Sequence, residues 1–212
     1  LSPNADAPAF AGVGKYGIGG MDLSDDGNIL YFVNLFDKKV YSIDLTNYYA
    51  TGNLPTASNV SSITISDPGC SNGSFRPFAL KIREGKMYIG MVCDASSGTT
   101  SKLVAYVKSF DLTSQTWSDV FDFPLTYPKG YPDQADGTRT GWYVWSDDPA
   151  VVNPSNNQAV MHPVPILSDI EFDMDGTMVL ALMDRTSHQY GIQNTDFWNG
   201  SSWQLSSVWL VA

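Results

Sequence analysis

The stretch DLSDDGNILYFVNLFDKKVYSIDL, residues Asp22–Leu45, decides the fold of this chain. Its apolar residues alternate with polar ones or run in short bursts, and the bursts end at clusters of Asp, Asn, Gly or Lys. This pattern is typical of short strands joined by tight turns. The Asp-Gly pair at Asp26-Gly27, between two apolar runs, is the strongest short-range signal of a β-hairpin. We therefore expect three antiparallel strands between Ile18 and Leu45.

Two later stretches repeat this pattern. They are RPFALKIREGKMYIGMVCDA, residues Arg76–Ala95, and PILSDIEFDMDGTMVLALMDR, residues Pro165–Arg185. Aligning the turn glycines Gly27, Gly85 and Gly176 superimposes three triplets, which are Met21-Asp22-Leu23, Leu80-Lys81-Ile82 and Ile170-Glu171-Phe172. Repeated four-stranded meanders with such a turn between their first two strands are the signature of β-propeller blades.

The predicted fold class is all-β, with β-propeller-like blades arranged as about three four-stranded antiparallel meanders in a single segment, 1–212. The blade-like units run over about 17–46, 76–125 and 165–212, and a long loop occupies 127–164. Three blades cannot close a ring, because propellers typically have about 4–8. The chain is therefore expected to be part of a larger propeller. The alternatives are that it pairs with other blades or copies through its open edges, or that it builds another β fold from the same meanders.

Composition restricts the class of partner. The chain has 212 residues, with 12 Lys and Arg against 22 Asp and Glu, so its formal net charge is −10. A nucleic-acid partner is not expected, because neutralising phosphates requires a basic face. No apolar run is long enough to predict a membrane span. Leu1 is not followed by a basic-then-apolar leader, which is the expectation for a processed chain.

The two cysteines, Cys70 and Cys93, are compatible with one disulfide. In the chain-entropy picture such a bridge would stabilise the fold by roughly 3 kcal/mol. The alternative is two free thiols, one in a loop and one at the end of a strand. Asn-x-Ser triplets at Asn59, Asn72 and Asn199, together with few lysines, fit a secreted protein.

Four carboxylates at alternate positions form a candidate metal site, and they are Asp169, Glu171, Asp173 and Asp175. Their oxygens suit a hard cation such as calcium. The alternative interpretation is structural, because residues two apart in a strand share a face and four carboxylates on one face repel each other. In that interpretation Asp173 and Asp175 build an Asx-type turn, while Asp169 and Glu171 lie at a strand rim.

Asp184, Arg185 and His188 form the most enzyme-like group. A carboxylate, a guanidinium and an imidazole near one strand end could hold an oxyanion and move a proton. The structural alternative is an Asp184–Arg185 ion pair beside a surface histidine. Asn34 and Asp94 occupy comparable strand ends in the other two copies, so polar side chains are expected to line one mouth of the propeller.

Aromatic residues in the long loop form a candidate sugar platform. Trp142 and Trp145 flank Tyr143, with Asp147 and Asp148 close in sequence. Flat aromatic faces stack on pyranose rings, and carboxylates accept hydrogen bonds from hydroxyl groups. Packing as the core of the loop itself is the alternative. The ligand class that this platform predicts is a carbohydrate or a protein surface.

The three repeated segments resemble the propeller-like region of very large secreted or cell-surface bacterial proteins that also carry SdrD B-like repeats. The resemblance covers about residues 17–191, and its most specific parts are RPFALK and SDIEFDMDG followed by LMDR. It implies an extracellular or cell-surface protein with a blade architecture, and it favours a disulfide between Cys70 and Cys93. It carries over no catalytic residue.

The predicted function is a non-enzymatic extracellular binding or structural module of a bacterial surface or matrix protein. The alternative, from another class, is a secreted hydrolase or lactonase of propeller fold. Its metal would be held at the central channel by Asp169, Glu171 and Asp184.

Overall fold

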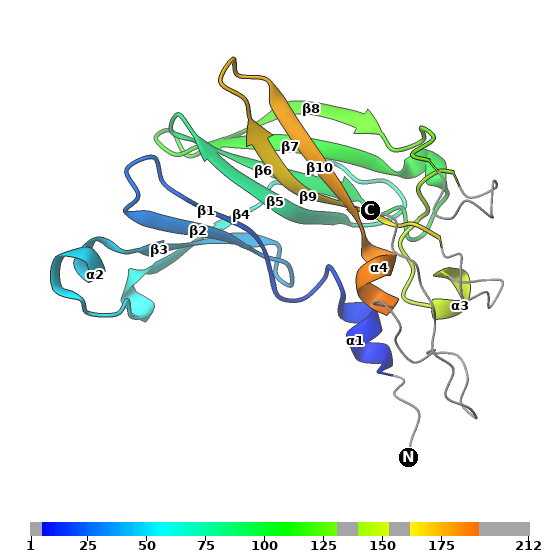
Figure 1. The fold of residues 1–212 in the computed structure, drawn as a ribbon, viewed down its shortest axis with the longest axis horizontal. Coiled ribbons are helices and arrows are strands. Elements are labelled where there is room, and N and C mark those ends of the chain that lie inside the picture. The colour runs from blue at the N-terminus through cyan, green and yellow to red at the C-terminus, as the bar shows by residue number, and fades with distance from the viewer. Residues whose placement is uncertain (1–5, 131–139, 153–161, 191–212) are drawn as a thin grey trace.

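The computed structural model describes residues 6–130, 140–152 and 162–190. Within these ranges the strands form two four-stranded sheets and one two-stranded hairpin, and all strand pairs are antiparallel (Figure 1). The predicted all-β class is therefore confirmed.

The first sheet has the order β1-β2-β3-β4. Its strands are β1 (Ile18–Leu23), β2 (Ile29–Asn34), β3 (Lys39–Asp44) and β4 (Val60–Thr64). The first hairpin forms where the sequence predicts it, because the Asp26 carboxylate accepts hydrogen bonds from the Ser24 hydroxyl and the Asn28 N–H. Gly27 allows this turn by adopting a φ of 73°. Strand β4 was not predicted, because its residues are mostly polar and exposed.

The second sheet has the order β5-β6-β7-β8, and the hairpin pairs β9 with β10. The strands are β5 (Phe75–Arg83), β6 (Lys86–Cys93), β7 (Val104–Asp111), β8 (Thr116–Pro124), β9 (Pro165–Phe172) and β10 (Met178–Asp184). The third predicted meander thus has two strands in the described part of the chain. The sequence predicts that this unit continues to residue 212, and residues 191–212 lie outside the described residues.

Short helices connect and flank the sheets. They are α1 (Ala7–Gly12), α2 (Thr46–Thr51), α3 (Pro149–Val152) and α4 (Arg185–Tyr190), with 3-10 turns at Ala57–Asn59 and Thr100–Lys102. Helices α1 and α4 lie together at one end of the strands (Figure 1), where the rings of Phe10 and Tyr190 meet edge to face. They close the end at which β10 finishes.

Strands β5, β6 and β7 of the second sheet are largely buried on both faces because they lie between the other two units, whereas β8 is mostly exposed. Toward the first sheet it presents large side chains, which are Leu80, Ile82, Met87, Ile89, Met91 and Phe110. Toward the hairpin it presents small ones, which are Ala79, Val92, Ala105 and Val107. The two sets alternate along each strand, as side chains do in a pleated sheet. A doubly buried sheet explains the nearly continuous apolar run MYIGMVC in β6.

Glycines let neighbouring sheets approach closely. A β-carbon on Gly20 of β1 would lie 2.6 Å from the backbone nitrogen of Leu80 in β5. A β-carbon on Gly90 of β6 would lie 2.7 Å from Cδ2 of Leu167 in β9. Both positions need glycine because a larger residue would push the sheets apart.

A chain of charged side chains links the first strands of the three sheets. Lys81 of β5 donates to the Glu171 carboxylate of β9 at 2.9 Å, and its Nζ lies 3.7 Å from Oδ2 of Asp22 in β1. Asp22 also accepts the Ile82 N–H at 2.9 Å. The hydrogen bond to Glu171 raises the pKa of Lys81. These three charged residues hold the middle position of the aligned sequence triplets, so equivalent residues of three units meet.

Candidate functional site

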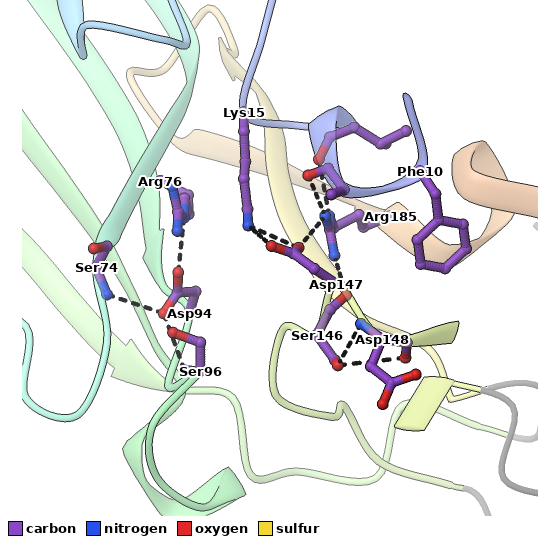
Figure 2. Close-up of polar contacts among 12 residues, drawn as sticks. Phe10, Lys15, Ser74, Arg76, Asp94, Ser96, Ser146, Asp147, Asp148 and Arg185 are labelled. Carbon is purple, nitrogen blue, oxygen red and sulfur yellow. Dashed lines mark hydrogen bonds and ion pairs between the residues drawn. The ribbon is translucent and has the colours of Figure 1, made fainter. Parts of the chain in front are cut away.

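Two strand ends and one loop meet at a polar cluster, which is the candidate site (Figure 2). Asp94 follows β6, Arg185 follows β10, and Asp147 lies in the loop before α3. Arg76 of β5 and Lys15 from the segment after α1 complete the charged set. The backbone leaves the sheets at this point, so its N–H and C=O groups need new hydrogen-bond partners.

The Asp94 carboxylate is fully buried and holds the end of β6. Its Oδ1 accepts the backbone N–H groups of Ser74 and Ser96 at 2.9 and 3.0 Å. Its Oδ2 accepts the Nε–H of Arg76 at 2.7 Å. Burial alone would raise the pKa of Asp94, but the two backbone bonds and the Arg76 charge together lower it below its ordinary value. A β-carbon on Gly73 would collide with Oδ1, so this carboxylate also requires the glycine.

Asp184 holds the end of β10 in the same way. Its Oδ1 accepts the N–H of Val164, which precedes β9, at 2.8 Å and the N–H of Thr186 at 2.9 Å. Burial raises the pKa of Asp184, and it outweighs the two backbone bonds that act in the opposite direction. Asp94 and Asp184 therefore share one geometry but differ in the sign of their pKa shifts.

The first sheet carries a related bond at its own strand end, where Oδ1 of Asn34 accepts the Phe36 N–H at 2.9 Å. Asn34, Asp94 and Asp184 thus each accept the N–H of the residue two positions later. The sequence predicted that these side chains line an open mouth. In the structure they bind the backbone instead, because the turns that follow the strands leave N–H groups without sheet partners.

Arg185 is completely buried at the start of α4. Its Nε–H donates to the Val13 carbonyl at 2.8 Å, and its Nη1 donates to the Ser146 carbonyl at 2.7 Å. Its Nη2 donates to the Ala11 carbonyl and to Asp147 Oδ1, both at 3.0 Å. Burial lowers the pKa of Arg185, and the Asp147 carboxylate opposes that shift. One guanidinium therefore joins the N-terminal segment, the long loop and the end of β10.

Trp145 packs against two guanidinium groups. Its ring centroid lies 4.6 Å from Cζ of Arg185 and 5.5 Å from Cζ of Arg76. Its indole N–H donates to the Pro165 carbonyl at 2.9 Å, and its backbone N–H donates to the Asp94 carbonyl at 3.0 Å. Cation–π contacts of this kind contribute on the order of 1 kcal/mol each.

The candidate sugar platform is buried. Trp142 and Trp145 belong to the core between the second sheet and the hairpin, so neither ring presents an open face on which a sugar could stack. Their burial favours the alternative interpretation, packing, although the rings join the core shared by the second sheet and the hairpin rather than a core of the loop alone. Tyr143 stacks on His162 at a centroid distance of 3.7 Å.

The enzyme-like group is not assembled as the sequence predicted. Arg185 pairs with Asp147 rather than with Asp184, because the polypeptide turns into α4 directly after β10. His188 lies exposed on α4. The three predicted members therefore have three separate environments.

The four candidate calcium ligands have separate local partners. Asp169, Asp173 and Asp175 accept backbone N–H groups of Ile170, Met174 and Thr177, and Glu171 binds Lys81. Among the residues described, no three His, Cys, Asp or Glu side chains gather as metal ligands. Calcium binding stays a prediction, and the Asx turn at Asp175 agrees with the structural alternative.

The candidate metal set of the hydrolase interpretation spans most of the hairpin. Asp184 is opposite Pro165, six positions along β9 from Glu171. At about 3.3 Å per residue, roughly 20 Å of strand separates them. Glu171 and Asp184 therefore cannot bind one ion.

The predicted disulfide between Cys70 and Cys93 is present. Cys93 ends β6, directly before Asp94, and Cys70 lies in the loop that leads into β5. The bridge and the Asp94 carboxylate therefore hold the same strand end.

Sequence reasoning did not find Arg76, Asp147 or Lys15 as members of the cluster. Lys15 binds both carboxylate oxygens of Asp147, at 2.5 and 2.7 Å. A usable signal was the position of Arg76 beside the apolar strand FALKI, in a chain with only 12 basic residues. The pairing of Lys15 with Asp147 spans 132 positions and leaves no local pattern.

The chain is similar in sequence to two colossins. No protein-family model matches the sequence. The chain is 29% identical to colossin-C of Dictyostelium discoideum over 178 residues, which are 82% of this chain and 16% of colossin-C. It is also 29% identical to colossin-A of the same organism over 118 residues, which are 54% of this chain and 1% of colossin-A. The chain therefore spans a small part of the length of these relatives.

These relatives correct the resemblance drawn from sequence. The assignment to bacterial proteins with SdrD B-like repeats is wrong, because the matching proteins are colossins from a eukaryote. Among solved structures, an endo-1,4-beta-xylanase from Bacteroides thetaiotaomicron aligns at 13% identity and a TM-score of 0.37, over 78% of this chain and 58% of that chain. A TM-score this low supports neither a shared fold nor a shared activity. No helix in the described ranges is long and apolar enough to cross a membrane.

Proposed function

We propose that the three sheets are neighbouring units of a β-propeller-like arrangement, with β1, β5 and β9 as their inner strands. Each unit packs face to face on the next unit in chain order, as propeller blades do. The contact of Asp22 with Lys81 and of Lys81 with Glu171 supports this arrangement, because it joins equivalent positions of inner strands.

The hairpin turns give a second line of support. The Asp25 carboxylate in the first turn accepts the Gly85 N–H of the second turn at 2.8 Å. Arg83, beside the second turn, donates to the Asp173 carbonyl beside the third at 3.4 Å. Equivalent turns therefore lie next to each other along the series, which is expected of blades around a common axis.

In this arrangement the chain serves as a non-enzymatic structural or binding module. The observation that carries this function is that the polar side chains at the strand ends bind the protein's own backbone. A catalytic acid, base or cation must reach a substrate atom. Asp94 and Arg185 are fully buried, and they direct their oxygens and N–H groups onto the protein backbone.

An extracellular location is part of the same proposal. Disulfides form and persist in oxidising compartments, and Cys70–Cys93 is one. The relatives are much longer than this chain, which supports a role as one module within a larger protein. If the module binds a ligand in addition to its structural role, the proposed partner is a carbohydrate or a protein surface.

The experiment that tests this function replaces Arg185 by lysine and follows thermal unfolding. Arg185→Lys keeps the charge but cannot reach the three carbonyls of Ala11, Val13 and Ser146 together. Each stranded carbonyl costs about 1–3 kcal/mol. An ammonium that keeps one of these bonds leaves two carbonyls stranded, and a loss of at least about 2 kcal/mol would lower Tm by about 4 °C or more in a chain of this size.

His188→Ala is the matched control, because His188 is exposed on the same helix. Its Tm is expected to stay within about 2 °C of the parent. An unchanged or raised Tm for Arg185→Lys would contradict the structural role, because residues held for activity commonly lower stability and their replacement raises it.

A further inference from the structure

The outward face of the first sheet is apolar. Met21 and Leu23 of β1 lie opposite Phe32 and Leu30 of β2, and residues directly opposite in antiparallel strands share a face. The same face continues across β3 and β4. We call it the outer patch, and its main members are Met21, Leu23, Leu30, Phe32, Ile43 and Val60. Along each strand, residues of the outer patch alternate with residues that point into the core, so the first sheet is apolar on both faces.

The equivalent face of each later unit packs against the unit before it. We call this the trailing face. Leu80 and Ile82, which align with Met21 and Leu23, are 2% and 6% exposed against the first sheet, whereas Met21 and Leu23 are 57% and 41% exposed. Ile170 of the third unit, in the same position, is buried against the second sheet. The outer patch is thus a trailing face without a preceding unit in the described residues.

The opposite face of each unit is its leading face, and in the first and second sheets it packs against the next unit. In the second sheet it carries Ala and Val residues, onto which the larger trailing residues of the hairpin pack. On the hairpin itself the leading face carries Val179 and Ala181, opposite Glu171 and Asp169. Val179 and Ala181 are exposed. The described residues therefore present an exposed trailing face at one end and, at the other, an exposed leading face on which Val179 and Ala181 lie beside the carboxylates of Asp169 and Glu171.

We propose that the outer patch binds the leading face of the hairpin in a second copy of this chain. The contact is head to tail, and a two-fold axis repeats it, so each copy uses both of its end faces. The three units that the structure describes in each copy give three plus three, or six, which lies within the range of about 4–8 blades that closes a propeller. This inference rests on the blade arrangement proposed above.

Charge sets the conditions for this contact. Each chain carries a net charge of −10, so two copies repel each other at low ionic strength. At an ionic strength of about 0.15 M the Debye length is about 8 Å, which screens most of that repulsion. Burial of apolar surface does not weaken in this way. The dimer fraction is therefore expected to rise with added salt.

The test is light scattering after size exclusion, on the full chain at micromolar concentration and at two salt concentrations. The expected mass in the higher salt is twice the chain mass of 23.2 kDa. Met21→Asp and Val179→Asp each place a charge in one of the two end faces, so each variant alone is expected to run at the monomer mass. Both positions are exposed, so each variant is expected to keep the parent's circular dichroism.

Mixing the two variants distinguishes a head-to-tail contact from other dimers. The Met21→Asp copy keeps an intact leading face and the Val179→Asp copy keeps an intact outer patch, so a mixture is expected to recover the dimer mass through one contact. Met174→Asp is the matched control, because Met174 is almost fully exposed in the hairpin turn and lies on neither face. It is expected to stay dimeric.

Three results would overturn the inference. They are a monomer mass at both salt concentrations, a dimer that survives Met21→Asp or Val179→Asp, and a mixture of these variants that stays monomeric. A monomer in which a carbodiimide still joins the Lys81 amine to the Glu171 carboxylate would leave the blade arrangement standing. In that case the face is covered by something other than a second copy.

Discussion

At the scale of single residues, one device recurs at the ends of the second strands. Asn34, Asp94 and Asp184 each bind the N–H two residues later, and the two aspartates also bind the residue that precedes the first strand of their hairpin. Only Asp94 pairs its second oxygen with a guanidinium, that of Arg76. Asp94 and Asp184 thus make the same kind of backbone hydrogen bonds, but their pKa values shift in opposite directions.

The comparison of Asp94→Asn with Asp184→Asn tests this difference. An asparagine oxygen can still accept the two N–H groups at either position. At position 94 the new amide N–H₂ would face the Nε–H of Arg76, and breaking this buried pair is expected to cost about 3 kcal/mol. At position 184 the variant removes a charge that burial disfavours, so Tm near neutral pH is expected to stay equal or rise.

The same variants carry opposite pH dependence. The folded pKa of Asp94 lies below 3.8, so its carboxylate stabilises the fold above that pH, and this contribution is lost as the pH falls through the folded pKa. The deficit of Asp94→Asn should therefore shrink in acid. The folded pKa of Asp184 is raised, so ionisation costs stability as the pH rises through it, and any gain of Asp184→Asn should be larger at neutral pH. Tm measured against pH checks both signs, and equal curves for the two variants would contradict the assignment.

At the scale of elements, the hairpins were predictable and the polar connections were not. Asp-Gly and Glu-Gly turns flanked by apolar runs located β1 with β2, β5 with β6 and β9 with β10, because turn chemistry and alternation are local signals. Strand β4 was not predicted, because it is a mostly polar edge strand that pairs with β3. The partners of Arg185 were also beyond a sequence-based prediction, because its bonds to Ala11 and Val13 span more than 170 positions.

The disulfide is expected to hold the loop before β5 against the end of β6. Replacing both Cys70 and Cys93 by serine releases a loop with a sequence separation of 23 residues. The chain-entropy relation gives a loss of roughly 3 kcal/mol for a loop of this length. Urea unfolding with and without reductant measures it. The parent should lose this stability on reduction and the double variant should not respond, whereas equal parent stability with and without reductant would contradict a stabilising bridge.

At the scale of the whole molecule, order along the chain matches order in space. The second sheet lies between the first sheet and the hairpin, and each neighbouring pair has its own core. The aligned triplets from the sequence predicted which residues are equivalent, and Lys81 then lies between Asp22 and Glu171. Packing of Trp142 and Trp145 was one of the two sequence-based interpretations. The surface on which they pack was not predictable, because tertiary structure alone selects the side of a sheet that a long loop covers.

The most direct test of the side-by-side arrangement is zero-length carbodiimide cross-linking of the monomeric protein, read by peptide mass spectrometry. Only amines and carboxylates in close contact form the amide. Lys108 and Asp119, which pair at 2.7 Å within the second sheet, provide a reference that does not depend on how the units pack. We expect a Lys81–Glu171 cross-link alongside the Lys108–Asp119 one. Recovery of the reference cross-link without any cross-link between Lys81 and Glu171 would contradict the proposed packing of the units about a common axis.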